Sequence, residues 1–197
     1  LVFVDADMTF APDFVEELVA PIKEGKTKGT FTKEEYVSNW ENVWARCWNY
    51  NAGLYDAKRL PKNYPDTAPV FRAILKKEFT KVGGFTTHVG WTDDWTLSQK
   101  LGYQSTSTVA KCFHTNPENL TSAWEQASWI GKNEFYTRNI FRVKINLLLH
   151  SFPISVVIGT YKSMRTRTPQ FLIFKLVYDL AISTSIIRSL WSRDRNK

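Results

Sequence analysis

The chain opens with an apolar run that ends in two acidic residues. Residues 1–4 read Leu-Val-Phe-Val, and Asp5 and Asp7 follow with a single alanine between them. A short apolar run rich in β-branched residues predicts a strand that is buried on both faces, as in a parallel sheet with helical crossovers. Such a strand needs neighbours on both sides. We therefore expect further βα units to precede Leu1.

Helix and strand signals alternate along the following part of the chain. Pro12 predicts the start of an amphipathic helix, and the capping-box spacing at 32–35 predicts a longer helix that runs through Trp48. Apolar stretches at 70–75 and 105–112 predict strands, and residues 82–85 predict a tight turn with unusual backbone angles at its glycines. A helix through Leu97 and Leu101 is predicted to start at residue 93 or 94 and to end at Gly102. This alternation indicates an α/β fold with a mostly parallel sheet and flanking helices.

Three tryptophans on the predicted helix share one face. Trp40, Trp44 and Trp48 recur at four-residue intervals. A stripe of this kind is typical of a face that packs into a core, although stacking on sugar rings or a place at a membrane interface would need the same spacing.

Asp5 and Asp7 form the first candidate site. An α/β sheet places ligand-binding groups beyond the carboxyl ends of its strands. Two carboxylates there can hold Mg²⁺ or Mn²⁺, because these hard cations take oxygen ligands and share the phosphate oxygens of a bound molecule. The alternative is that the two acids only occupy a solvated loop between a strand and a helix.

Charge and cysteine content narrow the class of partner and the compartment. The formal net charge of +7 favours a partner that carries phosphate, whether nucleotide, nucleic acid or anionic lipid. Clustered acids at 5–7 and 93–94 are unexplained by nucleic-acid binding, so no nucleic-acid partner is expected. Cys47 and Cys112 have neither zinc-site nor disulfide-framework spacing, which favours a reduced environment that faces the cytosol.

Two motifs, in order, resemble family 2 glycosyltransferases. Residues 1–19 are similar to the DxD segment of that family, in which a strand ends in metal-binding acids and Pro-Asp begins the next helix. Residues 79–85 resemble its acceptor-side turn, and residues 92–97 resemble its TED or EDW segment. The resemblance implies that residues 1–138 form part of a GT-A catalytic domain, from which the N-terminal βα units are missing.

The resemblance also implies an activity and its residues. The family's inverting members move a sugar from a nucleotide-diphosphate donor to an acceptor hydroxyl, here of a glycan or a lipid-linked molecule. Asp5 and Asp7 would bind the cation and the donor, and Asp94 would be the general base with Asp93 as its support. A second interpretation of the two later acids is a helix N-cap, which is worth about 1 kcal/mol.

Other residues are implied on the acceptor side. Gly83 and Gly84 would shape the acceptor-side wall and Trp95 would lie beside it. Gln126 and Trp129 fall in a segment similar to the family's QxxRW motif, but the arginine is absent and the tryptophan comes one residue early. These two residues are either acceptor contacts or ordinary helix-packing residues.

His114 lies just beyond the predicted strand at 105–112 and has two interpretations. It is either a third contact to the metal or diphosphate, or a hydrogen-bonded structural residue.

Residues 139–197 differ in composition from the rest. Two apolar stretches, 145–159 and 171–191, are joined by a basic link, and Lys175 and Asp179 interrupt the second at helical spacing. A pair of amphipathic helices in the membrane surface is expected, with the catalytic domain facing the cytoplasm. The alternative is a helical hairpin packed on the catalytic domain.

A second enzyme class shares part of the first motif. Residues 4–9 also resemble motif I of haloacid dehalogenase-type phosphatases, in which Asp5 would be the nucleophile and Asp7 an acid/base. Residues 93–94 would then serve as metal-binding acids. The turn at 82–85 has no role in that scheme, so glycosyl transfer is the preferred hypothesis and the phosphatase is kept as the alternative.

Overall fold

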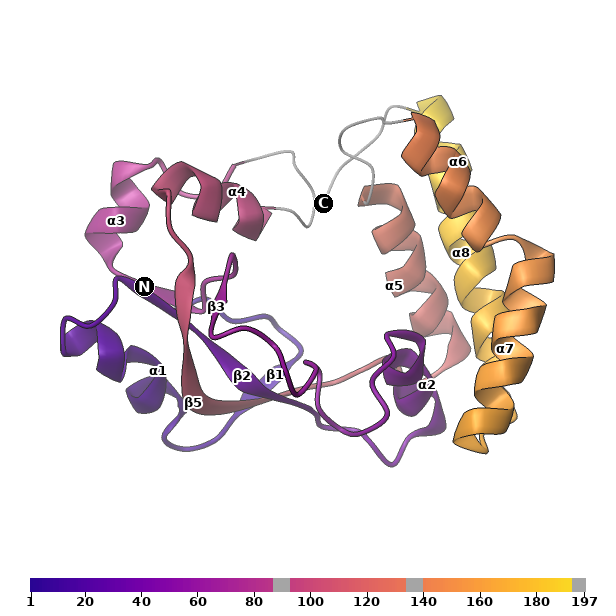
Figure 1. Cartoon of the computed structure of the whole chain (residues 1–197), viewed down its shortest axis with the longest axis horizontal. Coiled ribbons are helices and arrows are strands. Elements are labelled where there is room, and N and C mark those ends of the chain that lie inside the picture. The colour runs from indigo at the N-terminus through magenta and orange to yellow at the C-terminus, as the bar shows by residue number, and fades with distance from the viewer. Residues whose placement is uncertain (87–92, 134–139, 193–197) are drawn as a thin grey trace. The chain divides into compact units, whose positions relative to one another are not determined.

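The structure is a computed structural model that describes residues 1–86, 93–133 and 140–192, and its class is α/β (Figure 1). In chain order the elements are β1 (Met8–Phe10), α1 (Phe14–Lys23), β2 (Gly29–Val37), α2 (Val43–Asn51), β3 (Thr67–Ala68), β4 (Ala73–Ile74), α3 (Lys76–Lys81), α4 (Asp93–Leu101), β5 (Ser105–His114), α5 (Leu120–Asn133), α6 (Ile140–Leu149), α7 (Phe152–Thr166) and α8 (Gln170–Ser192).

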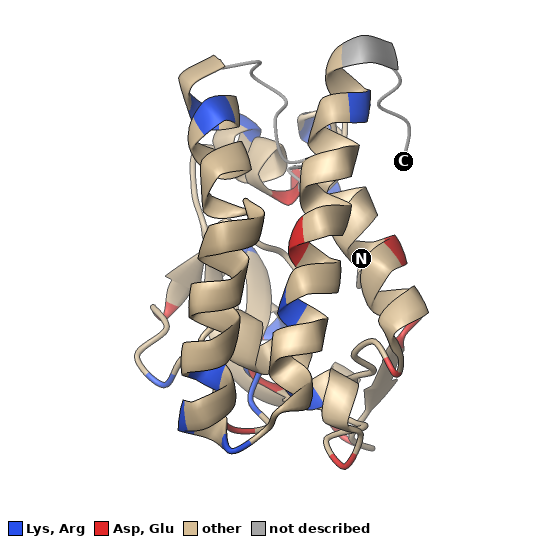
Figure 2. Cartoon of the chain, turned by 90° about the vertical axis from the view of Figure 1, so that its right-hand side faces the viewer, with Lys and Arg blue, Asp and Glu red and all other residues tan. Residues whose placement is uncertain are grey.

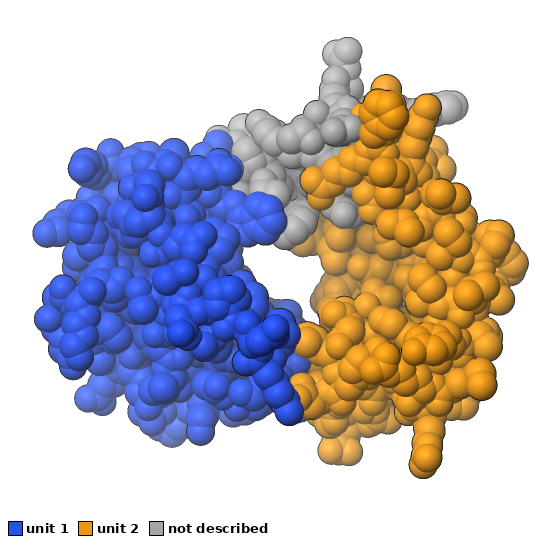
Figure 3. Space-filling model, viewed as in Figure 1, with its two compact units in different colours: residues 1–38, 57–87, 92–115 blue, residues 39–56, 88–91, 116–197 orange. Residues whose placement is uncertain are grey.

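Two compact units make up the chain, as Figure 3 shows in two colours. The sheet unit comprises residues 1–38, 57–87 and 92–115. The helical unit comprises residues 39–56, 88–91 and 116–197. All five strands of the described chain belong to the sheet unit, and α2 and α5 to α8 belong to the helical unit.

The sheet is mixed, so the prediction of a mostly parallel sheet is wrong. Its strand order is β1-β5-β2-β4, and β3 also pairs with β5. The two long strands, β2 and β5, run parallel, whereas β1, β3 and β4 join them antiparallel. The three antiparallel strands are short, with two or three residues each.

Residues 1–4 do not form the doubly buried strand predicted for them. The segment lies beside β4, where Leu1 N donates to Ile74 O at 2.8 Å and Phe3 N donates to Arg72 O at 2.8 Å. Leu1, Val2 and Val4 are nevertheless exposed, and only Phe3 is half-buried. The pairing is a single bridge, Val2 with Ala73, and the named strand β1 begins only after the acids.

Residues 29–37 form β2, which corrects the helix predicted from residue 32. Thr30, Phe31 and Thr32 are buried, and the Thr32 hydroxyl donates to the Ala110 carbonyl of β5 instead of capping a helix. Pairing with β5 has overridden the local capping signal, as tertiary context commonly does. The helix begins at Val43, where the Asn42 side chain accepts from Trp44 N at 2.8 Å.

The tryptophans of this region pack as a core face. Trp40, Trp44 and Trp48 contact a buried cluster in the helical unit that includes Phe171 and Phe174 of α8. Trp48 meets Phe174 edge to face, with ring centroids 6.3 Å apart. The packing interpretation of the aromatic stripe is therefore confirmed.

Local signals are confirmed in the second half of the sheet unit. Gly83 and Gly84 adopt left-handed φ angles of 72° and 71°, and a Cβ on Gly84 would lie 2.9 Å from the Phe79 ring. Helix α4 ends before Gly102, whose φ is 74°, and β5 follows as predicted. The turn at 82–85 thus needs glycine for both its conformation and its packing.

Helix α1 covers one face of the sheet. Phe14 and Leu18 are almost fully buried and pack on Ala110 and Cys112 of β5. Residues 110, 112 and 114 alternate along one face of the strand. The core under α1 therefore leads directly to His114 at the end of β5.

Helix α8 is the centre of the helical unit and packs against α5 and α7. Gly131 of α5 allows a close approach, because a Cβ there would lie 2.7 Å from the Ile182 carbonyl oxygen. The buried Asp179 of α8 links that helix to α7, because its carboxylate accepts from the Ser155 hydroxyl at 2.6 Å. It also accepts from Lys175 at 2.8 Å and lies 2.6 Å from His150 Nδ1.

Candidate metal centre

The pairing of β1 with β5 brings the first acids to His114. The chain turns after Asp5, where Met8 N donates to the Asp5 carbonyl, and Asp7 immediately precedes β1. In the β1–β5 register Met8 lies opposite His114. Thr115 N then donates to the Asp7 carbonyl at 3.1 Å, which fixes the backbone of Asp7 at the end of β5.

The side chains of Asp5, Asp7 and His114 converge. One possible ligand atom from each lies within 4.8 Å of those of the others, and Asp7 Oδ1 is 3.8 Å from His114 Nδ1. The two carboxylates are exposed, whereas His114 is 4% exposed. The group thus offers two carboxylate oxygens, which suit Mg²⁺ and Mn²⁺, and one imidazole nitrogen, which suits the transition metal Mn²⁺ better than Mg²⁺.

His114 is in the form that can bind a metal. Burial lowers its pKa to about 4, and the positive charges of Arg59 and Arg72 act in the same direction. The imidazole is therefore neutral at pH 7, and a neutral ring nitrogen is the ligating form.

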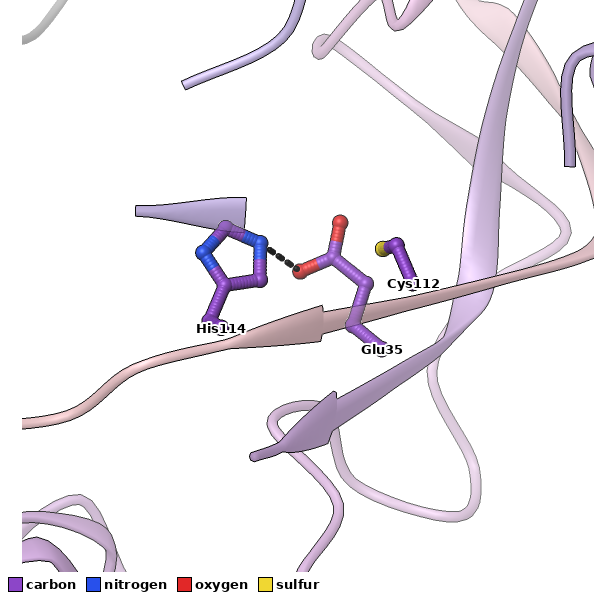
Figure 4. A group of neighbouring side chains, drawn as sticks. All are labelled: Glu35, Cys112 and His114. Carbon is purple, nitrogen blue, oxygen red and sulfur yellow. Dashed lines mark ion pairs between the residues drawn. The ribbon is translucent and has the colours of Figure 1, made fainter. Parts of the chain in front are cut away.

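A second group shares His114 and is less suited to a cation. Glu35, Cys112 and His114 also lie close together, and Figure 4 shows the Glu35 carboxylate between the other two side chains. Burial raises the pKa of the Cys112 thiol to about 12, with Glu35 acting in the same direction. Mg²⁺ and Mn²⁺ prefer carboxylate oxygens to sulfur ligands, so the group with Asp5 and Asp7 suits them better.

Two residues that the sequence analysis did not predict, Arg72 and Glu35, link Asp5 to His114. Arg72 Nη1 donates to Asp5 Oδ2 at 2.8 Å, and its Nε lies 3.5 Å from Glu35 Oε1. Glu35 Oε2 in turn lies 3.5 Å from His114 Nε2. Burial raises the pKa of Glu35, and Arg72 and Arg59 oppose that shift. A chain of charged groups therefore links Asp5 to His114.

A sequence signal for Glu35 existed but was interpreted as a helix start. Glu35 alternates with Val37 on one face of β2, opposite Cys112 and His114. An acid at an inward position of a strand is unusual and indicates a partner or a ligand. Arg72 has no comparable signal, because its place depends on pairing between distant segments.

The second predicted motif is anchored next to the first. Phe3, two residues before Asp5, packs against Phe79 and Phe85 with ring centroids 5.3 and 5.1 Å apart. Leu97 of α4 joins the same cluster, and the Lys100 ammonium donates to the Gly84 carbonyl. The turn and α4 are thus held on the segment that carries the acids.

The predicted catalytic acids lie in the first turn of α4. The helix starts at Asp93, and Asp94 is half-buried. Trp95 is 49% exposed, as an acceptor-side residue would need to be. Thr92, the first residue of the motif, lies outside the described residues. The roles of these acids stay predictions.

Gln126 and Trp129 lie on α5 in the helical unit. Both are exposed, while Ala123 and Ala127 of the same helix are buried. They lie outside the buried face of α5. Their role as acceptor contacts stays a prediction.

A comparison of the chain with models of protein families, with curated proteins and with solved structures gave no match.

Proposed function

We propose that the chain is the catalytic part of a family 2 glycosyltransferase with a GT-A fold, which transfers a sugar with inversion from a nucleotide-diphosphate donor. The observation that carries the proposal is the convergence of Asp5 and Asp7 on the buried, neutral His114. Two ordered motifs support it, because the turn at 82–85 packs on the segment that leads to Asp5.

Asp5, Asp7 and His114 hold Mg²⁺ or Mn²⁺ in this proposal. A cation there supplies charge neutralisation for the departing diphosphate. The exposed carboxylates leave room for phosphate oxygens, while the buried imidazole fixes the third position. Holding the cation therefore falls to the end of β5 and the loop before β1.

Asp94 accepts the proton of the acceptor hydroxyl, with Asp93 beside it. Inverting transfer requires a carboxylate on the side of the sugar opposite the leaving group. Asp5 and Asp7 are committed to the cation, so a second acid is needed. The acceptor, a glycan or a lipid-linked molecule, meets the wall formed by Gly83, Gly84 and Trp95.

The test is release of nucleoside diphosphate by the full-length natural protein from a panel of nucleotide-diphosphate sugars, with and without Mn²⁺. Asp94→Asn is expected to slow release by about 10²- to 10⁴-fold, the usual contribution of a general base. Asparagine is nearly isosteric with aspartate, and losing a negative charge in the first turn of α4 costs only about 0.3–1 kcal/mol, so this variant keeps the helix intact. Asp13→Asn, at the start of α1, is the matched control and should retain activity.

Two outcomes would overturn the proposal. Full release by Asp94→Asn would remove Asp94 as the base. A phosphate trapped on Asp5, with no turnover of any nucleotide sugar, would show the phosphatase chemistry instead.

We also propose that the helical unit attaches the protein to the cytoplasmic face of a membrane. In Figure 2 most of the length of α6, α7 and α8 carries no charge. Among the described residues, Gln170–Leu190 of α8 is long and apolar enough to cross a bilayer, and α6 with α7 passes the same test as a pair bent by 53°. Large apolar side chains are exposed on all three helices: Phe141, Leu148, Phe152, Val157, Met164, Ile173, Leu180 and Ile187.

Replacing exposed apolar residues of α7 should release the protein from lipid. Val157 and Met164 are 68% and 75% exposed, so Val157→Glu with Met164→Glu should leave the fold intact. Burial of each such side chain in lipid contributes roughly 1.5–3 kcal/mol, so we expect binding to weaken more than about tenfold. Flotation with phosphatidylcholine–phosphatidylglycerol vesicles measures this.

Val109→Glu is the control for the membrane experiment, because Val109 is 67% exposed in the sheet unit. It should float with the vesicles like the wild type. If the double variant floats as well, the exposed face of α7 is not what binds lipid. If the wild type does not float, the proposal that the helical unit attaches to a membrane is wrong.

A further inference from the structure

Arg72 is held rigidly at the back of the candidate metal centre. Its backbone N donates to Thr30 O at 2.8 Å and its carbonyl accepts from Phe3 N at 2.8 Å, so both neighbouring segments fix its position. The side chain is only 14% exposed. Its guanidinium extends from this fixed backbone to the Asp5 carboxylate.

The guanidinium is incompletely satisfied. Nη1 donates to Asp5 Oδ2 at 2.8 Å, but the buried Nε has no hydrogen-bond partner among the described residues. Glu35 Oε1, at 3.5 Å, is too far for a good hydrogen bond. A buried donor without a partner is costly, which indicates that a further acceptor completes this group in another state of the protein.

Arg72 and a cation compete for the same carboxylate. Asp5 is both the partner of Arg72 and a proposed metal ligand. When Asp5 turns to a cation, the guanidinium loses its hydrogen-bonded partner while remaining mostly buried. Glu35 Oε1 stays at 3.5 Å, too far to replace the lost hydrogen bond, so a new anion that accepts from the guanidinium is favoured in that place.

The anion that arrives with the cation has the right chemistry. Mg²⁺ and Mn²⁺ in such sites share the phosphate oxygens of the ligand. The planar guanidinium matches two phosphate oxygens with parallel hydrogen bonds. Arg59 adds positive charge nearby: its charge and the charge of Arg72 both lower the pKa of His114.

We propose that Arg72 is a diphosphate-binding residue that holds Asp5 while the site has no cation and turns to the phosphate oxygens when Asp5 binds the metal. This inference rests on the proposed metal site at Asp5, Asp7 and His114. It adds a residue to which no recognised motif points.

The proposal predicts opposite effects on the two ligands. Arg72→Met removes the competitor for Asp5, so the variant should bind Mn²⁺ alone at least as tightly as the wild type. The same variant should bind pyrophosphate in the presence of saturating Mn²⁺ about 10- to 100-fold more weakly, the usual range for lost charged hydrogen bonds. A residue that only supports the structure would weaken both.

Mn²⁺ binding is measured by electron paramagnetic resonance of the free ion, and binding of ³²P-labelled pyrophosphate by equilibrium dialysis. Lys58→Met is the matched control: it removes one positive charge from the sheet unit at a surface pair with Glu34 and should change neither affinity. Arg72→Lys keeps the charge but not the paired donors, and should weaken pyrophosphate binding while Mn²⁺ binding is retained. This variant decides the question if Arg72→Met does not fold.

The outcomes separate this inference from the function on which it rests. If the wild type binds Mn²⁺ and both Arg72 variants lose Mn²⁺ and pyrophosphate in parallel, or keep full pyrophosphate affinity, the role of Arg72 is wrong and the metal site stands. If the wild type does not bind Mn²⁺, the proposed metal site itself is wrong.

Discussion

Asp7→Asn is expected to weaken Mn²⁺ binding about 100-fold or more. The substitution removes a charged oxygen from the group with Asp5 and His114, and loss of even an outer-shell partner of a metal typically costs about 10- to 100-fold. Titration calorimetry at pH 7 measures the affinity, at a pH where His114 is neutral because its pKa is lowered to about 4. Asp66→Asn removes the same charge from an exposed pair with Lys33 and is the matched control.

Cys112→Ser distinguishes the two overlapping groups at His114. The protonated thiol is not part of the proposed cation site, so this variant should bind Mn²⁺ like the wild type. If Asp7→Asn binds Mn²⁺ as tightly as Asp66→Asn does, the assignment of Asp7 as a ligand is contradicted. Loss of binding in Cys112→Ser would move the site to Glu35, Cys112 and His114.

Asp179→Ala is expected to destabilise the helical unit by about 3–5 kcal/mol, the usual cost of breaking a buried charge pair by removing one partner. Asp179 is 1% exposed and binds groups on two other segments, Ser155 of α7 and His150. Lys175, which is 6% exposed, would be left buried without its 2.8 Å partner. Urea unfolding followed by circular dichroism measures the change.

Glu24→Ala is the control for Asp179, since Glu24 pairs with Lys26 at the surface. Its effect should stay within about 0.5 kcal/mol, as for most surface substitutions. An equally small effect of Asp179→Ala would mean that the buried network does not hold α7 and α8 together.

Local rules predicted the elements whose signals lie within a few residues. The left-handed glycines at 83, 84 and 102 and the apolar spacing of α4 depend only on neighbouring residues, and the structure confirms them. Strand β5 was predicted for the same reason. The strand preference of its apolar and β-branched residues is stronger than any helix preference in the segment.

Long-range pairing decided the elements that were predicted wrongly. Thr32 and Glu35 have the spacing of a capping box, yet β2 forms because it pairs in parallel with β5, more than seventy residues later. The short antiparallel strands have no sequence signature of their own, so the sheet could not be recognised as mixed. Tertiary pairing overrides weak local preferences in both cases.

The candidate site was only half visible for the same reason. Asp5 and Asp7 lie at motif positions, and His114 was expected beside them only as one of two interpretations. Glu35 and Arg72 reach the site because β2 and β4 pair beside residues 1–4 and β5. Charged residues brought together in this way carry no local pattern. The division of function between residues 1–138 and 139–197 stays a prediction.

The most direct test of the central claim is the pulsed electron paramagnetic resonance spectrum of Mn²⁺ bound to the protein, recorded before and after addition of a nucleoside diphosphate. We predict ¹⁴N modulation from a coordinated imidazole that is absent in His114→Asn, and ³¹P coupling once the diphosphate is added. Bound Mn²⁺ without nitrogen coupling, or without phosphorus coupling when the diphosphate is present, would contradict a cation that His114 and the donor diphosphate share.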